Sequence, residues 1–183
     1  SAYSTIAVQL YRENVLQKTF TQNLNYINDS AGFSFNVAIK AELAHYGIKV
    51  FGVKGNAYTL INYAQSILAG DAFIIQGQSN AESVLLEGSS NEENQSSFIR
   101  VYGSGGGHWE KEWKIGNGDV GAILNDEGNT GQWGLRLAKH LIDSFHVPVV
   151  VFNGAHGGKP ISYFKKRNDS TNNYAYLARR VLE

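Results

Sequence analysis

The protein has 183 residues, 43% of them hydrophobic and 17% charged, which is enough apolar content for one or two globular domains and argues against disorder. Its 16 basic and 16 acidic residues give zero net charge, so electrostatics offers no reason to expect nucleic acid or an anionic membrane as a partner. Cysteine is absent, which excludes thiol catalysis, disulfides and thiolate metal sites. No apolar run approaches the roughly 20 residues of a membrane span.

Residues 1–68 predict β-structure. Alternating apolar and polar residues predict strands at 5–11, 33–39 and 48–53. Turn residues separate these segments, at Asn28-Asp29, Gly32, Gly47 and Gly55-Asn56. Residues 41–44 predict a helical turn or connection. Such spacing is typical of an antiparallel sandwich or part of one, so we expect an accessory β-domain here and a second domain over 69–183.

Strands and helices alternate in the second part. Short apolar runs predict buried strands, at 72–75, 98–102 and 149–152. Apolar residues at helical spacing predict helices, from Leu135 to Phe145 after a cap at Asn129-Thr130, from Tyr174 to Leu182, and starting within 81–86. A helix, then Pro148, then a β-branched run indicates the second half of a βαβ crossover. We therefore expect strands 72–75 and 149–152 to be parallel.

A serine follows the first of these strands. The chain changes at Gly77 from apolar residues to the small polar sequence Gln78-Ser79-Asn80. A serine at the carboxyl end of a buried strand lies where α/β folds place ligands, and the N–H groups of a following helix would point at a group bonded to it. The sequence is not the Gly-x-Ser-x-Gly elbow, because its fifth residue is Ala81. The position suits a nucleophile, and an ordinary polar turn is the alternative.

The segment Gly70-Asp71 … Gln76-Gly77-Gln78-Ser79-Asn80-Ala81 resembles the first motif of the SGNH (GDSL-like) hydrolases. It is most similar to the sialate O-acetylesterase and acetylxylan esterase branch, in which Gly-Gln-Ser-Asn replaces Gly-Asp-Ser. The resemblance implies a flavodoxin-like α/β three-layer sandwich, here preceded by a small β-sandwich-like domain. It also implies that Ser79 is the acyl nucleophile of an O-acetylesterase acting on sialic acid or on an acetylated polysaccharide such as xylan, with no cofactor.

A second Gly-rich turn follows the strand at 149–152 and is expected on the same rim. Glycine lets the backbone approach a ligand and present its N–H. In the family, a Gly-Gly-Thr-like turn at this place supplies an oxyanion donor. The resemblance therefore assigns the oxyanion hole to the N–H groups of Ser79, Gly157 and Gly158. Lys159 departs from the usual Thr or Ser, and a plain tight turn is the alternative.

The catalytic base is not evident. In the family the base histidine comes from an Asp-x-x-His motif near the C-terminus, and an Asn turn supplies a further oxyanion donor; neither motif follows Ile161. The resemblance thus covers roughly the first half of an SGNH domain, and Asp and His are expected on missing sequence or on a companion chain. His156 is the internal candidate. The other histidines are expected on helices, on the surface or in the β-domain, at His45, His108, His140 and His146.

Candidate substrate contacts surround these turns or lie in the Gly-rich stretch 103–128, where aromatic rings could stack on sugars or hold the loop to the core. They are Gln78, Asn80, His156, Trp109 and Trp113. The alternative function is a non-catalytic carbohydrate-binding module on the same scaffold, using Trp109, Trp113 and Trp133. A metal-assisted hydrolase has little support, since the five histidines lack H-x-H or H-x₃-H spacing, and no metal is expected.

The composition is rich in Asn, Gly, Ser and Tyr, and the sequence begins without an initiator Met or a signal peptide. We therefore expect a mature bacterial protein that is secreted or periplasmic.

Overall fold

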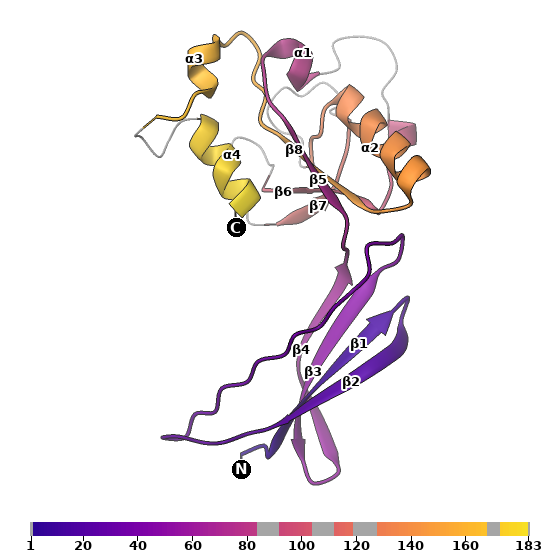
Figure 1. The fold of residues 1–183 in the computed structure, drawn as a ribbon, viewed down its shortest axis with the longest axis vertical. Coiled ribbons are helices and arrows are strands. Elements are labelled where there is room, and N and C mark those ends of the chain that lie inside the picture. The colour runs from indigo at the N-terminus through magenta and orange to yellow at the C-terminus, as the bar shows by residue number, and fades with distance from the viewer. Residues whose placement is uncertain (1, 84–91, 104–111, 119–127, 168–172, 183) are drawn as a thin grey trace. The chain divides into compact units, whose positions relative to one another are not determined.

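The computed structural model describes residues 2–83, 92–103, 112–118, 128–167 and 173–182. The chain forms two compact units, Ser1–Ala69 and Gly70–Glu183, against an expected division after residue 68. Each unit contains one four-stranded sheet (Figure 1). The protein is therefore an α/β protein with two sheets and few helices.

The N-terminal unit is an antiparallel sheet in the order β2-β1-β3-β4. Its strands are β1 (Thr5–Arg12), β2 (Val15–Asn23), β3 (Tyr46–Lys54) and β4 (Ala57–Ile67). The predicted strands 5–11 and 48–53 lie within β1 and β3, and both predictions are confirmed. The edge strands β2 and β4 escaped prediction because nearly all their side chains face solvent, so no alternation marks them.

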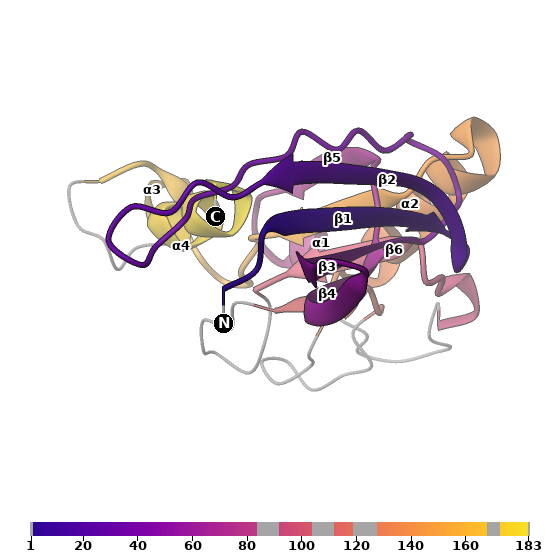
Figure 2. The same ribbon diagram turned by 90° about the horizontal axis from the view of Figure 1, so that it is seen from below.

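The predicted strand 33–39 is wrong, although its alternating pattern has a structural cause. This segment starts beside the end of β2, where the N–H of Ser34 donates to the side-chain oxygen of Gln22 at 3.2 Å, and then leaves β2 (Figures 1 and 2). Val37 and Ile39 pack against a core of Leu10, Ala44 and Tyr46. The alternation arises because every second side chain of a drawn-out segment faces the sheet.

Two further expectations for this unit need correction. Residues 41–44 form bends and a coil residue, and no helical turn is present there. Within residues 2–69 the strands form a single sheet, whereas a sandwich requires two packed sheets. The segment before β3 takes part of that role, because its side chains cover one face of the sheet.

The C-terminal unit has a mixed sheet in the order β5-β8-β6-β7. The strands are β5 (Asp71–Ile75), β6 (Ile99–Tyr102), β7 (Trp113–Ile115) and β8 (Val149–Asn153). The central strand β8 is parallel to β5 and β6, and β7 is antiparallel to β6. The expected parallel pairing is confirmed: Ala72 is opposite Val150, so β5 and β8 end at the same rim.

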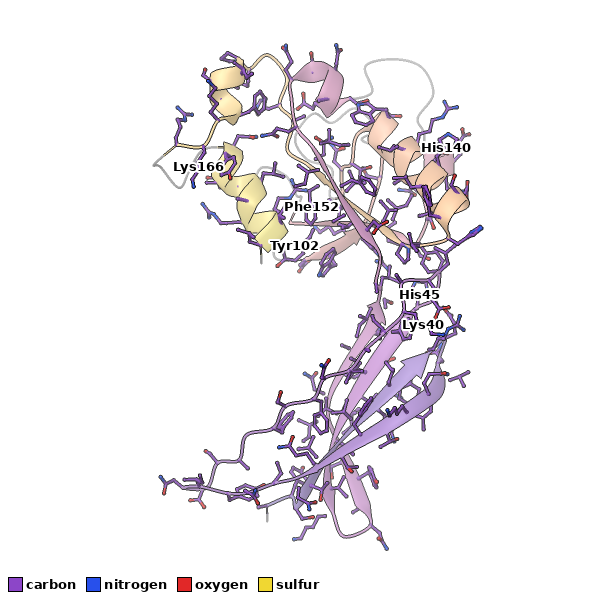
Figure 3. The ribbon with its side chains drawn as sticks, in the orientation of Figure 1. Lys40, His45, Tyr102, His140, Phe152 and Lys166 are labelled. Atoms are coloured by element: carbon purple, nitrogen blue, oxygen red, sulfur yellow. The ribbon has the colours of Figure 1, made fainter. Side chains whose placement is uncertain are left out.

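Helices lie on both faces of this sheet. A Cβ built on Gly134 of α2 (Gln132–Phe145) would lie 2.9 Å from Ile75 Cδ1, which places α2 on the face that carries Ile75. The opposite face carries Phe152, which is labelled in Figure 3. The guanidinium carbon of Arg180 in α4 (Asn173–Leu182) lies 5.8 Å from the centre of that ring. Short helices complete the unit: α1 (Ser79–Glu82), η1 (Glu92–Asn94) and α3 (Ile161–Phe164).

The two longer helices confirm the predictions at 135–145 and 174–182. The expected cap of α2 at Asn129-Thr130 is wrong by one or two residues, because the N-cap is Gly131. Thr130 is buried, and its hydroxyl donates to the carbonyl of Asn117 at 2.7 Å. The helix expected to start within 81–86 starts earlier, at Ser79, and ends at Glu82. No helix in the described ranges is long and apolar enough to cross a membrane.

Candidate active site

Two turns leave the carboxyl ends of the neighbouring strands β5 and β8, and backbone hydrogen bonds join them. The N–H of Gly154 donates to the carbonyl of Ile75 at 2.9 Å, which extends the ladder by one step. The N–H of His156 then donates to the carbonyl of Gly77, also at 2.9 Å. The turn that leads to Ser79 and the Gly-rich turn after β8 are therefore side by side on one rim.

Ser79 is the first residue of α1 and is exposed to solvent. Gln78 is the N-cap, and its carbonyl accepts the N–H groups of Ala81 at 2.8 Å and Glu82 at 2.9 Å. With four residues, α1 is a single turn, too short for an appreciable helix dipole. The expectation that the first N–H groups of a following helix point at a group bonded to Ser79 stays a prediction.

Gly157 brings the second turn closest to the serine. A Cβ built on Gly157 would lie 3.8 Å from Ser79 Cβ and only 2.7 Å from Glu82 Oε2. The N–H of Gly157 donates to that same carboxylate oxygen at 2.6 Å. The backbone donor assigned to the oxyanion thus faces the helix that carries Ser79, and it holds a carboxylate oxygen.

Gly158 is a glycine for a different reason. Its φ is +70°, a left-handed conformation that side chains disfavour, while a Cβ built on it would meet nothing within 4 Å. Gly158 lets the chain turn, whereas Gly157 lets the backbone come close to α1. Of the two glycines, Gly157 is therefore the one whose missing side chain faces Ser79 and Glu82, while the oxyanion roles of both stay predictions.

Asn153, the last residue of β8, is a functional candidate that sequence reasoning missed. Its side-chain Nδ2 donates to the carbonyls of Ala81 at 3.4 Å, Glu82 at 3.3 Å and Thr130 at 3.1 Å. Its Oδ1 accepts the N–H of Ala155 at 3.0 Å. One amide therefore connects α1, the chain before α2 and the Gly-rich turn. The only signal in the sequence was a polar residue ending an apolar strand.

A buried cation supports the same strand end. Arg180 donates from Nε to the carbonyl of Tyr102 at 2.8 Å and from Nη1 to the carbonyl of Asn153 at 2.8 Å. Burial lowers the pKa of Arg180 to about 10, because the charged guanidinium is desolvated. Its Nη2 is also buried and has no hydrogen-bond partner among the described residues.

His156 lies beside the turn, and its ring is directed to its own neighbours. Its Nδ1 lies 3.1 Å from the carbonyl oxygen of Gly157, and its ring packs edge-on against Tyr163 with centroids 5.5 Å apart. Within the described ranges no hydrogen bond joins the His156 ring to Ser79. Lys159, at the position of the usual Thr, places its Nζ 5.3 Å from the centre of the Tyr163 ring.

The other histidines that the structure describes lie away from this turn. His140 is on the exposed side of α2 (Figure 3), and His146 is the exposed C-cap of that helix. His45 belongs to the N-terminal unit, where its Nδ1 lies 3.5 Å from Glu13. His108 lies outside the described residues. Across the described ranges, no group of three or more His, Cys, Asp or Glu is arranged to hold a metal ion.

Some of the candidate substrate contacts lie near Ser79 and others do not. Gln78 and Asn80 flank Ser79 and are exposed. Trp113 is 61% exposed, but it lies on β7, which β8 and β6 separate from β5. Trp109 lies outside the described residues. Instead, Trp133 of α2 lies beside α1: its indole Nε1 donates to the carbonyl of Asn80 at 2.9 Å, and the residue is 41% exposed.

No family model matches the chain, and no curated protein matches its sequence. Among solved structures the chain is similar to a carbohydrate acetylesterase from Xanthomonas citri, with a TM-score of 0.41 and 18% identity. The alignment covers 91% of this chain and 37% of that one.

Proposed function

We propose that the protein is a serine esterase that removes O-acetyl groups from carbohydrate, with Ser79 as the nucleophile. The Gln-Gly-Gln-Ser-Asn motif supports this proposal, and the approach of Gly157 to Ser79 is the observation that carries it. The Gly157 N–H faces α1, and the built Cβ of Gly157 lies 3.8 Å from Ser79 Cβ. A nucleophile beside a backbone donor is the arrangement that acyl transfer requires.

In the proposed reaction, Ser79 Oγ attacks the acetyl carbonyl carbon and gives its proton to a base. The carbonyl oxygen becomes an oxyanion, which the N–H groups of Gly157 and Ser79 stabilise. The intermediate collapses, the ester C–O bond breaks, and the sugar oxygen leaves with a proton. Water then attacks the acetyl-Ser79 ester, which releases acetate and restores the serine.

The base is proposed to be a histidine, oriented by an aspartate, from the remainder of an SGNH catalytic domain, located on further sequence or on a companion chain. The open edge of the sheet supports the proposal that further sequence packs here. Among the described strands β5 pairs only with β8, and Ile74 of β5 is 55% exposed. In the same proposal, residues 1–68 form an accessory domain of a secreted or periplasmic bacterial enzyme. The 183-residue chain alone should then show no Ser79-dependent turnover of p-nitrophenyl acetate, whereas turnover lost in both Ser79→Ala and His156→Ala would make His156 the base.

The experiment that tests the nucleophile is covalent labelling of the natural full-length protein. A fluorophosphonate should modify the peptide that contains Ser79, and Ser79→Ala should lose this label. Labelling that persists unchanged in Ser79→Ala would contradict the proposal.

A non-catalytic carbohydrate-binding module is the second candidate, supported by the exposed Trp113 and Trp133, which are 61% and 41% exposed. In that case sugar binding, measured by calorimetry, would be unaffected by Ser79→Ala and lost on tryptophan substitution, with no labelling of the serine.

A further inference from the structure

We propose that Glu82 determines which esters the site accepts, by occupying the oxyanion donor in the resting protein. The Glu82 carboxylate accepts the Gly157 N–H at 2.6 Å, and the acyl oxygen of a substrate has to displace it. This inference rests on the proposed function of Ser79 and Gly157. It adds a residue that opposes acylation until substrate binding moves it aside.

A side chain at position 157 would meet this contact. The φ of Gly157 lies outside the left-handed region, so its conformation does not require glycine. What a side chain would meet is Glu82 Oε2, 2.7 Å from a built Cβ, with Ser79 Cβ at 3.8 Å. A Cβ at position 157 would therefore lie against the Glu82 carboxylate and within van der Waals reach of Ser79.

The backbone of Glu82 is held by hydrogen bonds on both sides of its Cα, whereas its carboxylate is held by the bond to Gly157. The Glu82 N–H donates to the carbonyl of Gln78 at 2.9 Å, and its carbonyl accepts Asn153 Nδ2 at 3.3 Å. The carboxylate itself makes one hydrogen bond to the described residues, the bond to Gly157. Rotation of this side chain alone would release the Gly157 N–H, with no change in α1.

A carboxylate oxygen and a tetrahedral oxyanion compete for this donor. Both are negatively charged acceptors, and the N–H has a single proton to offer. A carboxylate that stayed in place would also repel the charge that develops on the acyl oxygen. Glu82 therefore has to leave before or during acylation, and its charge-assisted bond is the cost of that step.

Which esters react depends on where the energy that displaces Glu82 comes from. Contacts to the sugar, remote from the acetyl group, can supply energy to displace Glu82, whereas a small activated ester offers few such contacts. Glu82 should thus suppress acylation by small esters more strongly than acylation by an acetylated carbohydrate.

The decisive variant is Glu82→Gln in the natural full-length protein, because it keeps the shape of the side chain and removes its charge. The second-order rate of Ser79 phosphonylation by a fluorophosphonate, a small probe, should rise about fivefold to tenfold, because a neutral acceptor holds an N–H less strongly than a carboxylate. Asp143→Asn is the matched control: it removes one carboxylate from the same unit, where Asp143 pairs with Lys139 on α2, and should leave the rate unchanged. Glu82→Ala tests the effect without any acceptor.

A second readout does not depend on activity. In the 183-residue chain, the Gly157 amide proton should move upfield in Glu82→Gln and exchange faster with solvent in Glu82→Ala, measured by ¹H–¹⁵N NMR. An unchanged Gly157 amide would overturn the proposal. So would a labelling rate that is unchanged or lower in Glu82→Gln, because Glu82 would then not compete with the oxyanion. If the wild type is not labelled at Ser79, the proposed function itself fails, and the specificity role of Glu82 fails with it.

Discussion

The indole Nε1 of Trp133 donates a hydrogen bond to the backbone carbonyl of Asn80 at 2.9 Å. This bond connects the first turn of α2 to the helix that begins with Ser79. It leaves Trp133 41% exposed, so an aromatic surface is available next to the proposed nucleophile. Aromatic faces of this kind are suited to contact with the apolar face of a sugar ring.

If Trp133 contacts the sugar, Trp133→Ala should raise KM for an acetylated oligosaccharide about fivefold, equivalent to roughly 1 kcal/mol. Trp133→Phe keeps a ring but loses the indole N–H, so its KM should lie between those of the wild type and of Trp133→Ala. Phe145→Ala removes an aromatic ring that is 66% exposed at the other end of α2, and serves as the control. Steady-state kinetics of the full-length protein measure kcat and KM. A fall in kcat without a rise in KM would assign Trp133 to holding α1 instead.

Asn153→Asp should impair both stability and turnover. The substituted oxygen would face the carbonyls of Ala81, Glu82 and Thr130, which now accept hydrogen bonds from Nδ2. The loss of these bonds should lower the free energy of unfolding by about 1–3 kcal/mol. Because α1 would shift, kcat should fall at least about tenfold while KM changes less.

Thermal unfolding and kinetics of the same sample test this prediction. Asn56→Asp is the control, since it makes the same chemical change at an exposed turn of the N-terminal unit. Equal effects of the two variants would show that the added charge, and not the lost amide, is responsible.

The two glycines of the turn should respond differently to substitution. Gly157→Val should lower turnover about 10²-fold or more, because its side chain would enter the space between Ser79 and Glu82. Gly158→Ala should instead cost about 1 kcal/mol of stability, because Gly158 has a φ of +70° with open space around it. Paired measurements of kcat and Tm distinguish the outcomes. Similar turnover for Gly157→Val and Gly158→Ala would show that Gly157 is not a donor of the oxyanion site.

The N-terminal unit should lose stability in acid through Glu42. Its carboxylate accepts hydrogen bonds from Arg12, at 2.9 Å from both Nε and Nη2, and from the Tyr46 hydroxyl at 2.6 Å. These bonds, that of Arg12 first, lower the pKa of Glu42 from 4.5 to about 2. Because the unfolded chain binds the proton more readily, this contribution is present above pH 4.5 and disappears as the pH falls towards 2.

Thermal unfolding of the wild type and of Glu42→Gln between pH 2 and pH 6 measures this effect. The wild type should be the more stable protein, by a difference that is full above pH 4.5 and shrinks as the pH falls towards 2. Since the Arg12 and Glu42 side chains are 42% and 31% exposed, salt should weaken the difference. A constant difference across this range would rule out a role for Glu42 ionisation.

Local periodicity predicted the elements whose side chains are buried on one side. The strands at 5–11 and 48–53 and the helix at 135–145 were found in this way, whereas short apolar runs found the strands at 72–75 and 149–152. The first of these runs was expected to be buried, but β5 is largely exposed. The same rule failed at 33–39, where the alternating residues face a sheet that the segment does not join. It also missed β2 and β4, whose exposed side chains carry no pattern of burial.

The sequence by itself predicted that two apolar strands end in turns that contain glycine, that one turn carries Ser79, and that the strands are parallel; the structure confirms the parallel orientation. Each of these follows from residues close together in the chain. The sequence also placed the turn of Gly157 on the rim that carries Ser79, but only the tertiary structure decided that the Gly157 N–H binds Glu82, 75 positions earlier in the chain, and that Asn153 joins α1 to the Gly-rich turn. Such contacts depend on how a register aligns two strand ends and on which side chains then fill the space between them. No local pattern of hydrophobicity records that geometry.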